Sequence, residues 1–313
     1  MIIVFGSLNI DMMLKVEHLP SAGETVKSPY YDWVPGGKGA NQAVAAARAY
    51  GIPSKVAMVG KVGDDGFGTR CSNNLKKEGI NCSGIGTCAI PTGCAAVIYD
   101  DKAENQIVVA SGANTEADSN QIPNEVLEKG HVILMQMEVP SAQNWALIER
   151  AHAKGARTIL NLAPAASIPR ETLNALDYLI VNQIEARQIS EKLGLKIETD
   201  AMKLAHSLAS NCELTCIVTI GAAGSVAATK DKGWRMAAMN LGDPVDTTGS
   251  GDAFCGAFAA ALHHDLSMEE ALKNASIAGS LACTKAGAQT AMPLKEDIED
   301  HLDQLPDAEI ISF

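Results

Sequence analysis

The sequence has few aromatic residues and no excess of basic residues, and both shortages bear on its partners. Aromatic side chains make up only 4% of the 313 residues, which is too few for the stacking platforms that bind single-stranded nucleic acids. The net charge is −12, whereas binding to a phosphate backbone needs a basic face. We therefore expect no nucleic-acid partner.

Long apolar runs and cysteine pairs are also lacking. No apolar stretch approaches the roughly 20 residues that span a membrane, so we expect no membrane partner. The first six residues contain no basic group and are typical of a short strand, not of a signal peptide. None of the eight cysteines belongs to a C-x-x-C motif. This usage predicts reduced core cysteines in a cytoplasmic protein.

Short apolar runs alternate with helical segments, most regularly from residue 130 onward. Strands are predicted over residues 2–5, 55–59, 132–137, 158–160, 178–181, 216–218 and 234–239. Helices are predicted over residues 43–50, 69–78, 255–262 and 267–285, with a loop over residues 60–68. This alternation predicts an α/β domain with a mostly parallel sheet.

Residues 24–34, 94–99 and 106–111 have a different pattern, because no helix separates them. They are rich in Val, Ile, Tyr or Ala and are predicted to be antiparallel strands of a small second sheet. Such a sheet could cover a site on the main domain. A sheet with one apolar face left over commonly pairs with a second copy of itself, so the pattern also predicts a homodimer.

The stretch Asp246-Thr-Thr-Gly-Ser-Gly-Asp-Ala-Phe254 runs directly into an Ala-rich helical segment. Gly249, Ser250 and Gly251 would therefore lie at a helix N-terminus, where unpaired N–H groups and the helix dipole favour an anion. A carboxylate beside a bound phosphate makes Asp252 a candidate general base for phosphoryl transfer. The alternative is that Asp252 only provides a favourable start to the helix.

Two earlier segments carry candidate binding residues. Asn9 and Asp11 are two residues apart, so an extended chain would direct both toward one side, where they could bind neighbouring hydroxyls. An Asx turn is the alternative interpretation. In residues 35–42, three glycines before a helix suggest close approach of a ligand, with Lys38 and Asn41 as polar contacts. A flexible turn with a solvated Lys38 is the alternative, and the spacing of a Walker A loop is absent.

Four of the predicted strands end in a polar residue: Glu138, Asn161, Asn182 and Thr219. Parallel sheets bind ligands in the crevice outside the carboxyl ends of their strands. A single such residue is more often a helix cap. Four of them directed into one crevice make a binding site the better interpretation.

Two long motifs, residues 36–48 and 246–254, are similar to the two signatures of the PfkB-type sugar kinases. Shorter similarities lie at residues 7–11, 136–138, 161–165 and 285–289, so the resemblance covers nearly the whole chain. It implies a single domain over residues 1–313 with a Rossmann-like, mostly parallel sheet flanked by helices on both faces. It also implies a β lid, formed from about residues 12–35 and 92–112, through which two copies dimerise.

The resemblance implies transfer of the γ-phosphoryl of ATP to the 5-hydroxyl of D-ribose, with Mg²⁺ and K⁺ as cofactors. A PfkB-type kinase for another small sugar or nucleoside, such as fructose, another ketohexose or a ribonucleoside, is the alternative. In this family pattern Asp252 is the general base. Gly249, Ser250 and Gly251 form the anion hole for the transferring phosphoryl group.

The resemblance also assigns the ligand contacts. The sugar-binding residues would be Asn9, Asp11, Gly37, Lys38, Gly39, Asn41, Glu138 and Asp252. The nucleotide-binding residues would be Asn182, Thr219, Gly221, Gly224, Gly251 and Ser276. Glu185 would organise Mg²⁺ through water. K⁺ would lie near Asp246, Thr248, Ala282, Lys285 and Gly287, held mostly by backbone groups.

The sequence departs from the family pattern at three positions. Gln183 replaces an acid that often follows Asn182, while the N-x-x-E spacing to Glu185 is kept. Ala291 stands where a Ser hydroxyl often reaches the K⁺ ion. Ser276 stands near the adenine, where a His or Asn is common.

Two functions of other classes are disfavoured. A nicotinamide-dependent oxidoreductase should carry G-x-G-x-x-G after its first strand, and that motif is absent. A non-catalytic sugar sensor should lack either Asp252 or the anion-binding loop, and both are present.

Overall fold

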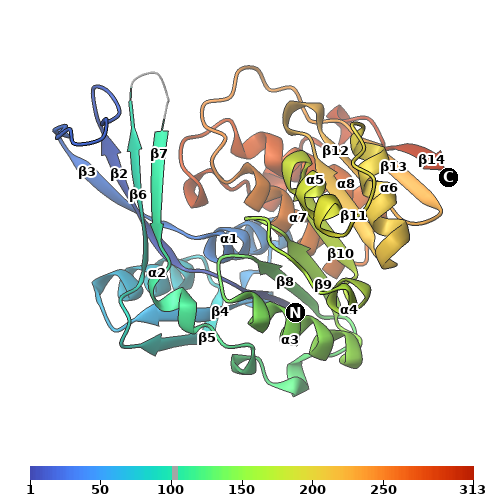
Figure 1. The fold of residues 1–313 in the computed structure, drawn as a ribbon, viewed down its shortest axis with the longest axis horizontal. Coiled ribbons are helices and arrows are strands. Elements are labelled where there is room, and N and C mark those ends of the chain that lie inside the picture. Colours follow the sequence, from blue (N-terminus) through green and yellow to red (C-terminus); the bar gives the residue numbers. More distant parts are fainter. Residues whose placement is uncertain (101–104) are drawn as a thin grey trace.

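The strands of the protein form two separate sheets (Figure 1). The structure is a computed structural model that describes residues 1–100 and 105–313, so residues 101–104 of the predicted lid lie outside the described residues. The larger sheet has ten strands in the order β14-β13-β12-β11-β10-β9-β8-β1-β4-β5. The smaller sheet has four strands in the order β3-β2-β6-β7.

The larger sheet is parallel from β5 to β11 and antiparallel at β12, β13 and β14. Its strands are β1 (Ile2–Phe5), β4 (Val56–Gly63), β5 (Asn81–Cys88), β8 (Val132–Gln136), β9 (Arg157–Asn161), β10 (Tyr178–Asn182), β11 (Thr215–Thr219), β12 (Ser225–Ala228), β13 (Lys232–Met236) and β14 (Glu309–Ser312). The predicted mostly parallel sheet is therefore confirmed.

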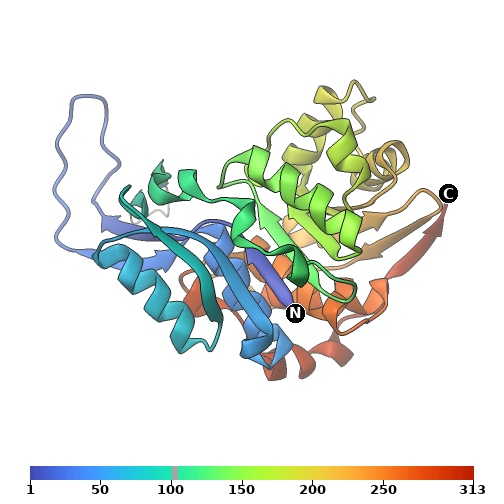
Figure 2. The same ribbon diagram turned by 90° about the horizontal axis from the view of Figure 1, so that it is seen from below.

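Helices cover both faces of this sheet (Figure 2). They are α1 (Lys38–Tyr50), α2 (Gly66–Lys77), α3 (Ser141–Lys154), α4 (Arg170–Asn174), α5 (Gln183–Lys192), α6 (Ala201–Cys212), α7 (Ser250–His263), α8 (Met268–Ala282) and α9 (Lys295–Glu299). Alternate residues of a strand face opposite sides of a sheet. In β1, Ile2 and Val4 accordingly pack in the cluster with α1, α7 and α8, while Ile3 and Phe5 pack in the cluster with α3 and α6.

The smaller sheet consists of β2 (Asn9–Lys15), β3 (Tyr31–Gly36), β6 (Gly93–Tyr99) and β7 (Asn105–Ala110). Two of its pairs are antiparallel as predicted, but β2 and β6 pair in parallel, so the prediction of a purely antiparallel sheet is wrong. The cause is β2, which was not among the strands predicted above. It follows β1 after only three residues and runs in the same direction as β6.

Several predicted boundaries are also wrong. The strand predicted over residues 24–34 begins only at Tyr31, because Pro29 has no N–H to give to a sheet and the segment before it is exposed. The loop predicted over residues 60–68 is divided between β4 and α2, whose first turn is capped by the Asp65 side chain. Helix α1 begins at Lys38, five residues before the predicted start. No helix in the described part of the chain is long and apolar enough to cross a membrane.

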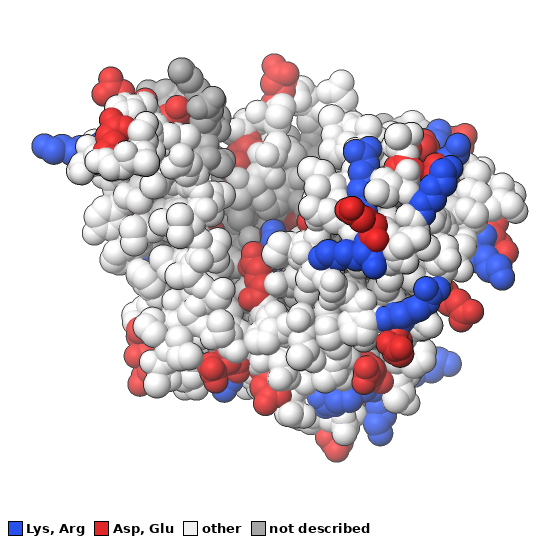
Figure 3. Space-filling view, in the orientation of Figure 1, with Lys and Arg blue, Asp and Glu red and all other residues white. Residues whose placement is uncertain are grey.

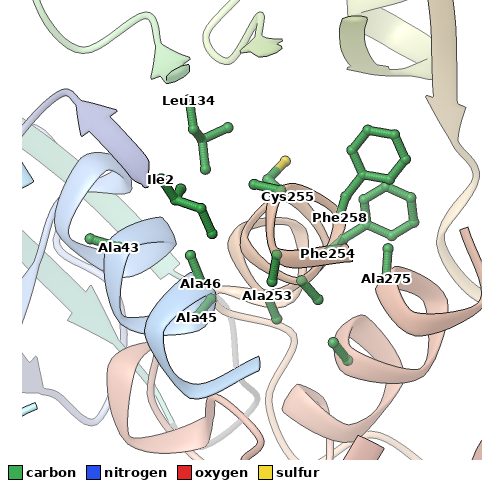
Figure 4. Packing of buried hydrophobic residues seen from close by; sticks show 14 of the residues in the cluster. Ile2, Ala43, Ala45, Ala46, Leu134, Ala253, Phe254, Cys255, Phe258 and Ala275 are labelled. Atoms are coloured by element: carbon green, nitrogen blue, oxygen red, sulfur yellow. The ribbon is translucent and has the colours of Figure 1, made fainter. Parts of the chain in front are cut away.

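Helices α1 and α7 pack unusually close together, with alanines at the contact (Figure 4). Gly256 of α7 makes this approach possible. A Cβ atom at Gly256 would lie 2.5 Å from Ala45 Cβ and 2.6 Å from Ala46 N, distances that real Cβ atoms do not show. The missing side chain therefore sets the spacing between the two helices that carry Asn41 and Asp252.

We expect Gly256→Ala to destabilise the protein by about 1–3 kcal/mol, because the added methyl group overpacks the α1–α7 contact. Gly66→Ala is the matched control, since Gly66 is also helical and a Cβ there meets nothing within 4 Å. Urea denaturation would measure both changes. Equal stability of Gly256→Ala and the parent protein would show that the two helices can separate without cost.

Candidate active site

The polar ends of neighbouring parallel strands lie at one edge of the larger sheet. Gln136 at the end of β8 pairs in register with Asn161 at the end of β9, and Asn182 of β10 pairs with Thr219 of β11. The face drawn in Figure 3 is hollowed between the smaller sheet and the rest of the molecule, with acidic and basic side chains inside the hollow. Glu138 lies two residues past the end of β8, and Asn161 pairs with Ile180, two residues before Asn182.

Asp252 lies in the first turn of α7 and is only 7% exposed. Gly249 caps this helix with a left-handed backbone (φ 77°), as the anion-binding prediction requires. Both carboxylate oxygens accept hydrogen bonds from α1: Oδ2 from Asn41 Nδ2 at 2.9 Å and Oδ1 from Gln42 Nε2 at 2.9 Å. A buried carboxylate at a helix N-terminus, held in a fixed plane, is well placed to accept a proton.

Glu138 is fixed by the N-terminus of α1. Its Oε2 accepts a hydrogen bond from Ser7 Oγ at 2.6 Å and one from the Lys38 backbone N–H at 3.0 Å. Ser7 Oγ in turn accepts from the Gly39 N–H at 3.2 Å. The carboxylate therefore benefits from the positive end of the α1 dipole while remaining next to the strand ends.

Asn9 is 4% exposed and is held by Asn114. Asn114 Nδ2 donates to Asn9 Oδ1 at 2.7 Å, and Asn114 Oδ1 accepts from the Leu8 N–H at 2.9 Å. This arrangement fixes which end of the Asn9 amide is the oxygen and leaves its NH₂ group as the donor for a ligand.

The three glycines of residues 36–39 are required by the protein's own chain. A Cβ at Gly36 would overlap the Asp11 carboxylate, and one at Gly39 would lie 2.5 Å from Ser7 N. Gly37 has φ 86°, and a Cβ there would lie 2.8 Å from Asn9 N. Close packing of the segment that carries Ser7, Asn9 and Asp11 therefore requires glycine at these positions.

The charges of the site are unevenly balanced. Burial lowers the pKa of the Lys38 ammonium, but the carboxylates of Asp252, Glu138 and Glu185 outweigh burial and raise it. Burial raises the pKa of Asp252, while Lys38 and the hydrogen bonds from Asn41 and Gln42 lower it. Asp11 also interacts with Lys38, so one lysine faces four carboxyl groups.

A cavity of about 310 Å³ brings together most of the residues predicted to bind a nucleotide. Its lining includes Thr219, Gly221, Gly224, Ser250, Gly251 and Ser276. Ser276 Oγ is buried and has no hydrogen-bond partner within the described residues, so it is available to a ligand. The cavity lies at the N-terminus of α7, where the unpaired N–H groups of the first turn favour phosphate.

Asn182 and Glu185 are not among the residues that line this cavity. They form a capping box at the start of α5: Asn182 Oδ1 accepts from the Glu185 N–H at 2.9 Å, and Glu185 Oε2 accepts from the Asn182 N–H at 2.8 Å. The capping interpretation of Asn182 is therefore correct. The charge of Glu185 still interacts with that of Lys38, so Glu185 faces the same crevice.

A second cavity of about 390 Å³ lies beneath the smaller sheet. Of the predicted sugar-binding residues, Asn9 and Glu138 line it, together with Val109 and Ser111 beside the end of β7. Met137 and Pro164 add apolar surface. Asp11, Lys38, Asn41 and Asp252 lie outside the lining of this cavity.

The predicted K⁺ site consists of two loops joined by Asp246. Asp246 Oδ1 accepts from the Thr248 N–H at 2.8 Å, and Oδ2 accepts from the Gly287 N–H at 2.9 Å. These hydrogen bonds lower the pKa of Asp246 despite partial burial. Ala282 is the last residue of α8, and Lys285 lies in the loop that follows it. Across residues 1–100 and 105–313, no group of three His, Cys, Asp or Glu side chains could hold a metal, so the donors for a cation here would be backbone carbonyls, water and ligand oxygens.

The sequence analysis assigned no role of their own to several residues that fix the site. They are Ser7, Gln42, Asn114, Gln136 and Gln289, all buried polar side chains. Gln42 could have been found, because two consecutive amides at the start of an otherwise Ala-rich helix need buried partners. Asn114 had no local signal, since its partners lie more than 100 residues away.

We expect Asp11→Asn to stabilise the ligand-free protein at neutral pH. Burial, followed by the charges of Glu138 and Asp252, raises the pKa of Asp11 from 3.8 to about 6. A raised carboxyl pKa gives stability that is complete below pH 4 and is lost as the pH rises through 6. The variant should therefore equal the parent protein near pH 4 and exceed it by about 2 kcal/mol above pH 7.

Urea denaturation at several pH values would measure this difference. Asp65→Asn is a control of opposite sign, because backbone and side-chain hydrogen bonds from Thr92 and Gly68 outweigh burial and lower the pKa of Asp65. Its destabilisation should disappear as the pH falls. A stability difference for Asp11→Asn that does not change with pH would contradict the raised pKa.

Comparison with known proteins agrees with this geometry. The chain is 36% identical over 303 residues to the ribokinase of Bacillus subtilis (strain 168), covering 96% of this chain and 99% of that protein. The crystal structure of Thermotoga maritima ribokinase superposes with a TM-score of 0.88 at 32% identity, covering 96% of this chain and 99% of that one. Arabidopsis thaliana ribokinase complexed with ribose and ATP superposes with a TM-score of 0.85 at 28% identity, covering 96% and 98%.

A family model described as pfkB family carbohydrate kinase matches residues 1–295, which include both signature segments and all of the residues assigned to the site. The buried Asp252 at the N-terminus of α7 and the adjoining cavity lie within this match. The chain belongs to the pfkB family of carbohydrate kinases.

Proposed function

We propose that this protein transfers the γ-phosphoryl group of ATP to the 5-hydroxyl of D-ribose, giving ribose 5-phosphate and ADP. The observation that carries the proposal is the buried Asp252 carboxylate, held by Asn41 and Gln42 next to the helix N-terminus that borders the cavity of about 310 Å³. Its relatives named ribokinase, one of them complexed with ribose and ATP, support both the acceptor and the donor.

In this reaction the 5-hydroxyl oxygen attacks the γ-phosphorus while the bond from that phosphorus to the β–γ bridging oxygen breaks. Asp252 accepts the hydroxyl proton, and ADP leaves. The first-turn N–H groups of α7, after Gly249, would bind the oxygens of the transferring phosphoryl group. Asn9, Asp11, Gly37, Lys38, Gly39, Asn41 and Glu138 would hold the sugar.

The nucleotide would occupy the cavity of about 310 Å³, beside Thr219, Gly221, Gly224 and Ser276. Glu185 would help to hold Mg²⁺ through water, and the ion would supply neutralisation of phosphate charge when bound. K⁺ would lie among backbone groups near Asp246, Thr248, Ala282, Lys285 and Gly287. Ala291 is buried and offers no hydroxyl there, so we expect weaker K⁺ activation than with Ser.

The proposed acceptor can be tested by measuring ADP release across a panel of pentoses, hexoses and nucleosides, with Asp252→Asn as the matched inactive variant. We expect D-ribose to give the highest kcat/KM. We expect Asp252→Asn to lower kcat by at least about 100-fold, because the general base is lost. Ribose binding, measured by calorimetry, should be retained.

If the protein preferred another furanose or a nucleoside, its acceptor would be one of the alternatives given for this family. Near-normal turnover by Asp252→Asn would remove Asp252 as the base. The small number of aromatic residues favours a small polyol over a nucleoside, because a nucleobase needs an apolar wall.

We also propose that the four-stranded sheet covers the sugar and forms a homodimer. One face of this sheet carries Tyr31 and Val108, each more than half exposed, while the equally exposed Ile107 and Val109 lie on the opposite face, where Val109 lines the cavity of about 390 Å³. An exposed patch of this kind on one sheet is typical of an interaction surface. All eight cysteines are free, which supports the predicted cytoplasmic location.

We expect Val108→Asp to convert the proposed dimer to a monomer, because burying a charge in an apolar contact is costly. Ile310→Asp is the matched control, since Ile310 is comparably exposed on β14, in the other sheet. Analytical ultracentrifugation would distinguish the two. A Val108→Asp protein that remains a dimer would place the contact elsewhere.

A further inference from the structure

The Asp252 carboxylate is connected to strand β8 through two buried glutamines. Gln42 Nε2 donates to Asp252 Oδ1 at 2.9 Å, and Gln136 Nε2 donates to Gln42 Oε1 at 2.7 Å. Both glutamine side chains are fully buried. Gln42 is the residue after Asn41 on α1, and Gln136 is the last residue of β8, so the connection crosses from the sheet to α7 through α1.

The chain of hydrogen bonds has a fixed direction. A carboxylate only accepts, so the NH₂ group of Gln42 must face Asp252. Its second N–H donates to Asn161 Oδ1 at 3.1 Å, whose own NH₂ group donates to the Ile180 carbonyl at 3.3 Å. The NH₂ group of Gln136 donates to the carbonyl oxygen at the other end of the Gln42 amide. If Gln42 were turned around, it would place its carbonyl oxygen against the carboxylate and its NH₂ against that of Gln136.

We propose that Gln42 and Gln136 are positioning residues that hold the Asp252 carboxylate in the orientation needed for proton abstraction. This inference rests on the proposed function of Asp252. Gln42 fixes one oxygen of the carboxylate, and Gln136 prevents the Gln42 amide from turning. Asn41 fixes the other oxygen, so the plane of the carboxylate is set before any substrate binds.

The same contacts oppose the rise in the pKa of Asp252 that burial causes. Burial raises its pKa, and the lowering contributions come from Lys38 and from the hydrogen bonds of Asn41 and Gln42. The other ionisable groups that face it are Glu138, Asp11 on β2, and Cys255 on α7. Loss of the Gln42 donor would therefore favour the protonated form, which cannot act as a base.

The test is the pH dependence of kcat for Gln42→Met, which keeps the side-chain length and removes the donor. We expect kcat to fall roughly 10- to 100-fold with a change in the sugar KM of at most about 2-fold. We expect the acidic limb of the profile to move up by about one pH unit. Gln136→Met should change both quantities in the same direction by less.

Asn144→Leu is the matched control for loss of a buried amide. Asn144 is also fully buried and donates to the backbone carbonyl of Gln136 at 2.7 Å, but it lies outside the hydrogen-bonded chain to Asp252. Asn144→Leu should lower the stability. Its kcat should stay within about 2-fold of the parent protein, and its acidic limb within about 0.2 pH unit. If Asn144→Leu shifted the acidic limb as far as Gln42→Met does, the two glutamines would have only a structural role.

Gln136→Glu gives a second, independent readout. In this variant a protonated carboxyl group at position 136 can donate to Gln42 Oε1, whereas the ionised carboxylate only accepts and would turn the amide around. The activity relative to the parent protein should therefore fall as the pH rises, and a constant ratio would overturn the proposal. If the parent protein turned over no sugar at all, the proposed function would be contradicted. Failure of the proposed function can therefore be distinguished from failure of the positioning proposal.

Discussion

The close contact between α1 and α7 is the constraint on which the site depends. Gly256 allows the two helices to approach until Gln42 and Asn41 reach the carboxylate of Asp252. The same approach brings Lys38, at the start of α1, within electrostatic reach of Asp252. Both helices point their N-termini toward the edge where the parallel strands end. Two helix dipoles and one ammonium group therefore share a region in which several carboxylates are buried.

This arrangement explains how the ligand-free site tolerates its negative charge. Glu138 is satisfied by the N-terminus of α1, and Asp252 by two amide side chains. Among the described residues, Asp11 has no comparable set of donors, and its raised pKa follows from burial beside Glu138 and Asp252. In the proposed function, a sugar hydroxyl that donates to Asp11 would supply a hydrogen bond to this carboxylate. The stability lost at Asp11 would then become a source of affinity for a polyol.

The sequence predicted the parts of the site that depend on local patterns. The turn at Gly249, the helix that carries Asp252 and the polar strand ends all follow from residues that are close together in the chain. The second sheet was less predictable. Its strand β2 is joined to β1 by only three residues and pairs in parallel with β6, which is more than 80 residues away. The contacts of Asn114, Gln136 and Gln289 are equally distant, and no local pattern could indicate them.

The glycines of residues 36–39 have a role within the chain that the motif alone does not reveal. Glycine before a helix is commonly associated with a ligand that approaches the backbone. Here Gly36 and Gly39 make room for Asp11 and Ser7 of the same chain. These glycines also place the site's side chains, since the packed strand carries Asn9 and Asp11 while the Gly39 N–H holds Ser7, which in turn donates to Glu138. Any larger residue at Gly39 would displace Ser7 and so disturb Glu138.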